Sequence, residues 1–185
     1  MKEKIQKAVE VMKNGGIILY PTDTIWGIGC DATNEEAINK IYKLKQREES
    51  KSMLVLVEND RRLQNIVDVP DLAWDLIDLS EKPTTIIYDS PKNVAKNIIA
   101  DDDTLGIRLV EPMFLKQLIG KLNKPLVSTS ANVSGHSSPT NFNDISDEIK
   151  NGVDFILDIE TDKVNKKSSS IIKLSADSQV KIIRK

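Results

Sequence analysis

Short apolar runs alternate along this chain with segments in which apolar residues recur at helical spacing, and this alternation constrains the fold more than any other feature. Apolar residues at i, i+3, i+4 and i+7, starting at Ile5, predict an amphipathic first helix. Residues 17–20 are apolar throughout and predict a strand buried on both faces. Further strands are predicted at residues 53–57, 84–88, 105–109, 126–128, 155–157, 171–174 and 180–183.

Helices are predicted between these strands, and the order of the two kinds of element indicates the fold class. The predicted helices lie near residues 35–47, 70–79, 112–122 and 145–150. Interleaved helices and apolar strands are typical of α/β proteins, and the two successive strands at the C-terminal end suggest antiparallel additions. We therefore expect an α/β fold with a twisted, mixed β-sheet on which the helices pack.

Length and charge limit the organisation of the chain and its partners. A chain of 185 residues that is 39% hydrophobic can bury one substantial core, so we expect a single domain spanning residues 1–185. The 26 basic and 28 acidic side chains give a formal charge of −2, with no long basic block. Aromatic residues are only 4% of the chain. Neither feature favours tight, unspecific nucleic-acid binding or a surface that stacks several bases.

Cysteine and histidine are too scarce for several kinds of site. Cys30 is the single cysteine, which excludes an internal disulfide and a multi-thiolate zinc site, and it is expected to be a small buried residue. His136 is the single histidine. No run approaches the roughly 18 apolar residues of a membrane-spanning helix, and residues 1–7 lack the apolar core of a signal peptide. The expected location is the cytoplasm.

Three polar segments follow apolar runs or helices and mark the candidate ligand site. They are residues 20–27 (YPTDTIWG), 45–47 (KQR) and 128–135 (STSANVSG). Each is rich in hydroxyls or cations and begins where a predicted strand or helix ends. Ligand sites of α/β proteins lie at such positions.

The cations after the second helix are candidates for binding phosphate. Lys45, Arg47 and Lys51 lie within seven positions, and the chain contains neither G-x-x-x-x-G-K-[ST] nor G-x-G-x-x-G. A bound nucleotide would therefore have its phosphates held by cationic and hydroxyl side chains. The alternative is a solvated helix end, where cations are favourable in any case.

The two hydroxyl-rich segments also have a structural alternative. Residues 21–24 could form a simple turn, and residues 128–140 could be a loop whose hydroxyls cap backbone amides. The density of hydroxyls in the second segment favours a ligand-binding loop. No base lies near these serines in the sequence, so a nucleophilic serine is not favoured.

Arg108 is the one charged residue within the predicted strand 105–109. A charge there is costly unless it is paired. Its partner could be a buried carboxylate of the protein or the carboxylate of a substrate. The acids at positions 101–103 could suggest magnesium, but acids in a turn before a strand are usually solvated.

In this order and at these spacings, the three polar segments resemble the YrdC/TsaC family over residues 16–185. The resemblance implies a YrdC-like fold and the synthesis of threonylcarbamoyl-AMP from ATP, L-threonine and bicarbonate or CO₂, with release of pyrophosphate. It also implies Mg²⁺ and transfer of the product to the machinery that makes threonylcarbamoyl-adenosine in tRNA. A protein of this kind would be a nucleotidyltransferase.

The resemblance implies roles for individual residues. The Lys-x-Arg and Ser-x-Asn pairs of the family's catalytic cleft are matched by Lys45, Arg47, Ser130 and Asn132. The positions implied to contact ATP are Arg47, Lys51, Thr104, Ser130, Ser138 and Arg184. Those implied to contact L-threonine are Thr24, Arg108, Ser128 and Ser169.

The chain departs from the family pattern at several positions, which leaves other functions open. These positions are Gln46, Glu48, Ser52 and Leu56, where relatives commonly have glycine, proline, proline and histidine. A divergent paralogue that transfers carbamoyl groups, as the YrdC-type module of hydrogenase-maturation proteins does, is one alternative. A translation accessory protein with weak RNA binding is the other.

Overall fold

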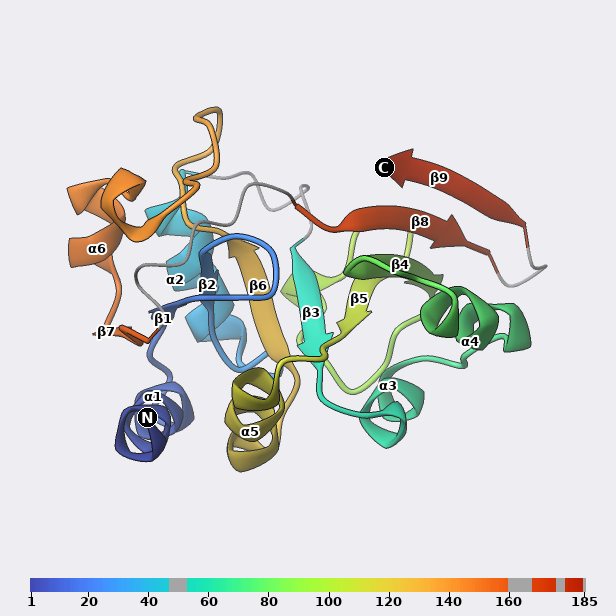
Figure 1. Ribbon diagram of the computed structural model, residues 1–185, viewed down its shortest axis with the longest axis horizontal. Coiled ribbons are helices and arrows are strands. Elements are labelled where there is room, and N and C mark those ends of the chain that lie inside the picture. The colour runs from blue at the N-terminus through green and yellow to red at the C-terminus, as the bar shows by residue number, and fades with distance from the viewer. Residues whose placement is uncertain (47–52, 160–167, 176–178, 185) are drawn as a thin grey trace.

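The computed structural model describes residues 1–46, 53–159, 168–175 and 179–184 (Figure 1). Within these ranges nine strands form one sheet in the order β7-β1-β2-β6-β3-β5-β4-β8-β9. The strands are β1 (Ile18–Tyr20), β2 (Gly27–Gly29), β3 (Leu54–Val57), β4 (Thr84–Asp89), β5 (Thr104–Leu109), β6 (Leu126–Ser130), β7 (Phe155–Ile156), β8 (Ser170–Leu174) and β9 (Val180–Arg184).

The sheet is mixed, which confirms the predicted α/β class. Strand β3 runs parallel to β5, β4 to β8, and β1 to β7, whereas the remaining pairs are antiparallel. The helices are α1 (Lys2–Lys13), α2 (Glu35–Leu44), α3 (Asp60–Ile66), α4 (Asp71–Asp78), α5 (Met113–Leu122) and α6 (Asp147–Gly152), with short 3₁₀ turns η1 (Lys96–Ile98) and η2 (Phe142–Asp144).

Two apolar clusters hold the helices against the sheet. In Figure 1, α1 and α5 lie side by side beneath the part of the sheet formed by β1, β2 and β6. The apolar stripe of α1, which begins at Ile5, packs there with Leu118 of α5 and with Ile18 of β1. The other cluster joins α2, α3 and α4 to the central strands, for example through Ile38 and Ile107. The periodicity predicted for α1 is thus the face that it buries.

Local signals explain where several elements begin. The Asn34 side chain accepts a hydrogen bond from the Ala37 amide at 3.0 Å and caps α2. Asn59 caps α3 in the same way, accepting from the Arg62 amide at 2.9 Å. Helix α3 was not predicted from the sequence because it is only seven residues long.

Strand β2 was not predicted either, because two of its three residues are glycines, which are uncommon in strands. The structure gives the reason for Gly29. A Cβ atom at this position would lie 2.4 Å from the Val127 carbonyl oxygen and 2.8 Å from the Tyr20 ring. Neighbouring backbone therefore approaches too closely for any side chain, and Gly29 lets β2 lie between β1 and β6.

Two sequence-based expectations about burial and membranes can be compared with the structure. Cys30 is fully buried, as expected, and burial raises the pKa of its thiol. Within the described ranges, no helix has the length and apolar character needed to cross a membrane.

We predict that Gly29→Ala lowers the free energy of unfolding by about 1–3 kcal/mol, because the new methyl group must displace backbone of β6. The matched control is Gly120→Ala in α5, where a Cβ would meet nothing within 4 Å. Alanine is the better helix former, so this control should keep or raise stability. Urea unfolding measures both, and equal midpoints for Gly29→Ala and the wild type would contradict the packing described.

Candidate functional site

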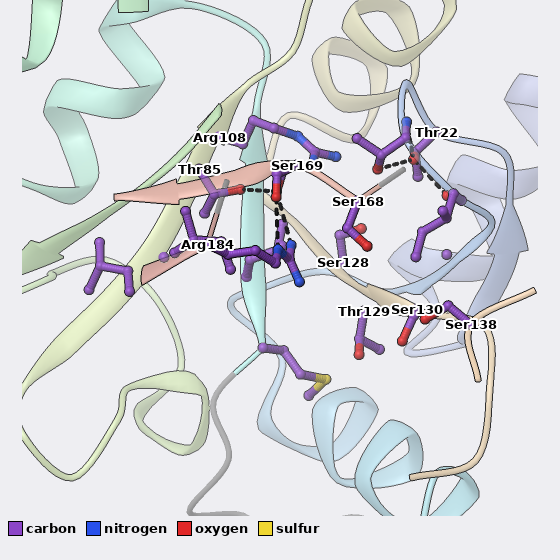
Figure 2. Close-up of a pocket in the computed structure, with 18 of the residues that line it drawn as sticks. Thr22, Thr85, Arg108, Ser128, Thr129, Ser130, Ser138, Ser168, Ser169 and Arg184 are labelled. Carbon is purple, nitrogen blue, oxygen red and sulfur yellow. Dashed lines mark hydrogen bonds between the residues drawn. The ribbon is translucent and has the colours of Figure 1, made fainter. Parts of the chain in front are cut away.

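A cavity of about 270 Å³ lies where the loop after β1 meets strands β5, β6 and β8 (Figure 2). Eight of the site residues predicted from the sequence line it. They are Thr24, Thr104, Arg108, Ser128, Ser130, Ser138, Ser169 and Arg184. These residues come from segments more than 150 positions apart, so the fold brings most of the predicted site together.

Four predicted residues do not line the cavity in the described part of the chain. Arg47 and Lys51 lie outside the described residues. The structure describes Lys45 and Asn132, but neither is among the residues that form the cavity wall.

Arg108 is the penultimate residue of β5 and is only 3% exposed. Its Nη2 donates to Asp23 Oδ1 at 2.8 Å, so the structural alternative, a buried partner carboxylate, is present. Burial lowers the pKa of Arg108, and the Asp23 charge opposes this. Its Nε–H has no acceptor within the described residues. A buried donor without a partner is unfavourable, so this group is available to an anionic ligand.

The loop that carries Asp23 is fixed by one hydroxyl. Thr22 Oγ1 donates to the Ile25 carbonyl at 2.7 Å and accepts from the Thr24 amide at 2.9 Å. It also lies 3.0 Å from Thr24 Oγ1. The turn expected at residues 21–24 is therefore real, and it presents the Thr24 side chain to the cavity. Its structural and ligand-binding interpretations are compatible.

Lys45 connects two of the polar segments. Its side chain is 1% exposed, and Nζ donates to the carbonyls of Ser130 and, at 2.5 Å, Asn132. The Ser134 amide in turn donates to the Lys45 carbonyl at 2.9 Å. The lysine thus holds the loop after β6 from behind, while the Ser130 side chain faces the cavity.

The Asn132 side chain lies within the same loop. Its Nδ2 donates to the carbonyls of Val133 and, at 2.7 Å, His136. Its buried Oδ1 has no partner within the described residues. The amide thus shapes the loop and leaves one acceptor open.

Ser168 and Ser169, just before β8, contribute hydroxyls to the cavity, and β9 contributes the Arg184 cation. Arg184 Nε donates to the Ser169 carbonyl at 2.9 Å, and Ser169 Oγ lies 2.9 Å from Thr85 Oγ1 (Figure 2). Burial lowers the pKa of Arg184.

Thr104 Oγ1 donates to Asp102 Oδ1 at 2.6 Å, and Lys173 pairs with that carboxylate at 2.7 Å. Both contacts lower the pKa of Asp102.

Several lining residues were not predicted. They are Thr22, Thr85, Thr129 and Ser168, together with apolar residues such as Met53 and Ile87. Thr85 carried a weak signal in the sequence, since it is a polar residue within a predicted strand. In the structure it is 1% exposed. The other hydroxyls adjoin predicted positions, where no local pattern distinguishes a lining residue from its neighbour.

A family model described as "Telomere recombination", for Sua5, YciO and YrdC proteins, matches residues 10–185. A Methanocaldococcus jannaschii protein named as a candidate threonylcarbamoyl-AMP synthase is 35% identical over 98% of this chain and 87% of its own length. The threonylcarbamoyl-AMP synthase of Pseudoalteromonas translucida is 33% identical over 72% of this chain and 74% of its own.

A solved structure gives the same fold. The P. abyssi Sua5 complex with L-threonine superposes with a TM-score of 0.81 at 22% identity, over 94% of this chain and 52% of the Sua5 chain. The present chain thus spans about half the length of that protein. Because the family model spans nearly all of its residues, this chain belongs to the Sua5/YciO/YrdC family.

Proposed function

We propose that this protein is a nucleotidyltransferase that makes L-threonylcarbamoyl-AMP from L-threonine, bicarbonate or CO₂ and ATP, releasing pyrophosphate. The product would serve the threonylcarbamoyl-adenosine modification of tRNA. The names of relatives that share most of their length with this chain support the activity. The observation that supports it most is Arg108, a buried cation with an unpaired donor in a cavity lined by hydroxyls.

In this proposal the amino acid binds beside Arg108 in the cavity. The Nε–H of Arg108 can donate to the α-carboxylate, and charge-assisted hydrogen bonds of this kind are among the strongest in proteins. The hydroxyls of Thr24 and Ser128 line the same cavity and can orient the amino acid. Ser169 lines the same cavity, where its hydroxyl contacts Thr85 and its carbonyl accepts a hydrogen bond from Arg184.

The nucleotide would lie toward the hydroxyls of Ser130 and Ser138, with Thr104 and Arg184 on the opposite wall. In this proposal Arg47 and Lys51, which follow Lys45 in the chain, stabilise the triphosphate and the departing pyrophosphate. The Ser130 hydroxyl is held in place through Lys45, because the lysine fixes the backbone that carries it.

The reaction has two bond-forming steps. The neutral amine of threonine attacks the carbon of CO₂ and loses a proton, or attacks the carbon of bicarbonate with loss of water, and either route gives a carbamate. A carbamate oxygen then attacks the α-phosphorus of ATP, and the bond to pyrophosphate breaks. Both reactants of the second step are anions, so the protein contributes alignment and neutralisation of the charge that develops on phosphate.

Mg²⁺ is expected with ATP, and the donor set of the cavity indicates how it would be held. Within the described residues, the lining offers hydroxyls and no carboxylate, and no group of three acidic, histidine or cysteine side chains could hold a metal ion. Triphosphate oxygens would therefore supply most of the ligands, with hydroxyls such as Ser130 or Ser138 adding to them. When bound, the ion would neutralise phosphate charge.

Incubation with ATP, Mg²⁺ and bicarbonate tests the proposal through pyrophosphate release. We expect release that depends on L-threonine and is much weaker with valine or alanine, because these lack the side-chain hydroxyl that the hydroxyl partners in the cavity can bind. Mass spectrometry should detect the threonylcarbamoyl adenylate. Release at the same rate without any amino acid would reject the assignment.

Lys45→Met tests whether the lysine acts through the loop. The substitution leaves two carbonyls without a buried donor, which should cost about 1–3 kcal/mol in the free energy of unfolding. It should also lower kcat by about ten- to a hundredfold through misplacement of Ser130. Lys43→Met on the exposed face of the same helix is the control. A variant with normal stability but no ATP binding would instead point to direct phosphate contact by Lys45.

A further inference from the structure

A second cavity, of about 290 Å³, lies on the other face of β5. Side chains of a strand alternate between its faces, so Thr104 and Arg108 line the first cavity, whereas Ile107 and Leu109 line the second. Asp23 lines the second cavity and is not among the residues that line the first. The ion pair between Asp23 and Arg108 therefore joins the walls of the two cavities.

Asp23 holds Arg108 at one end of its guanidinium group. The contact uses Nη2 at 2.8 Å, while Nε–H has no acceptor within the described residues. The two side chains are 11% and 3% exposed, so water screens their interaction little. The carboxylate comes from the Thr22–Ile25 turn, whose geometry is fixed by the Thr22 hydroxyl. The arginine is thus fixed in orientation before any ligand enters.

The pair also lowers the positive charge of the site, in which Arg184 is the other cation among the described lining residues. Arg108 carries one positive charge and Asp23 one negative charge, so the pair that forms the anchor is neutral overall. A ligand with a single carboxylate can accept the free donor, and its ammonium group is not repelled by an uncompensated cation. A ligand with a second carboxylate gains no net attraction and must desolvate another charge.

We infer that Asp23 is a positioning and specificity-determining residue, which orients Arg108 from outside the cavity and restricts the anchor to zwitterions with one carboxylate. The inference rests on the proposed function, since it assumes an amino-acid substrate. It assigns Asp23 no contact with the substrate. Discrimination against dicarboxylates comes from the absence of a net positive charge on the Asp23–Arg108 pair.

The test compares Asp23→Asn with the wild type, with L-aspartate as a probe that competes with L-threonine. Loss of the carboxylate frees the guanidinium group to move, so kcat with threonine should fall by about ten- to a hundredfold. The site gains one unit of positive charge, so the inhibition constant of L-aspartate should fall by roughly tenfold. A purely structural role for Asp23 would not strengthen binding of a dicarboxylate.

Two further variants complete the test. Asp23→Glu keeps the charge but moves the carboxylate by one methylene group, so it should retain weak aspartate inhibition while kcat still falls. Asp68→Asn is the matched control, because Asp68 forms an exposed ion pair with Lys92 at 2.9 Å and lines neither of the two cavities. It should match the wild type in both measurements.

The outcomes separate the inference from the proposed function. A folded Asp23→Asn variant whose aspartate inhibition is unchanged or weaker overturns the inference. If Asp23→Asn does not fold, Asp23→Glu decides, and an unchanged kcat overturns it. Binding of threonine and aspartate is also measured by calorimetry without ATP. A wild type that binds threonine but releases no pyrophosphate would contradict the proposed activity while leaving the role of Asp23 measurable.

Discussion

The requirement that a buried cation be paired governs the site more than any other interaction. Arg108 lies in a central strand and is almost fully buried, and an unpaired charge there would cost on the order of several kcal/mol. Asp23 satisfies the requirement, but only because the loop after β1 lies against β5. The same pairing that stabilises the sheet also fixes the wall of the cavity. Stability and the proposed recognition of the substrate therefore depend on one contact.

Lys45 is a second buried cation that needs partners, and it lies behind the loop after β6. Its ammonium group is buried, and its partners are backbone carbonyls of the loop that carries Ser130 and Asn132. By binding these carbonyls, the buried lysine fixes the loop that carries them. Lys45 and the Ser130–Asn132 segment, separated by more than 80 positions, are thus one structural unit. Their co-occurrence in the sequence has a physical basis in this contact.

Much of the fold could be predicted because hydrophobic periodicity decides which face an element buries. The stripe that begins at Ile5 and the apolar runs of β3 and β6 are examples, and all are buried as expected. Strand β2 and helix α3 could not be predicted in this way. A three-residue strand with two glycines has no pattern of its own, and it pairs only because β1 and β6 lie on either side of it.

For the site, the sequence by itself marked the polar segments that could bind a ligand, and its resemblance to the YrdC/TsaC family located eight of the residues that line the cavity. Polar residues at the ends of apolar runs are a local signal, and they can be read without the fold. Only the tertiary structure decided which side chains face the cavity and which hold it from behind. Asp23, Lys45 and Thr85 look alike in sequence, as polar residues near strands or helix ends. Their different roles depend on contacts across the sheet, where burial forces each polar group to find a partner that no local pattern specifies.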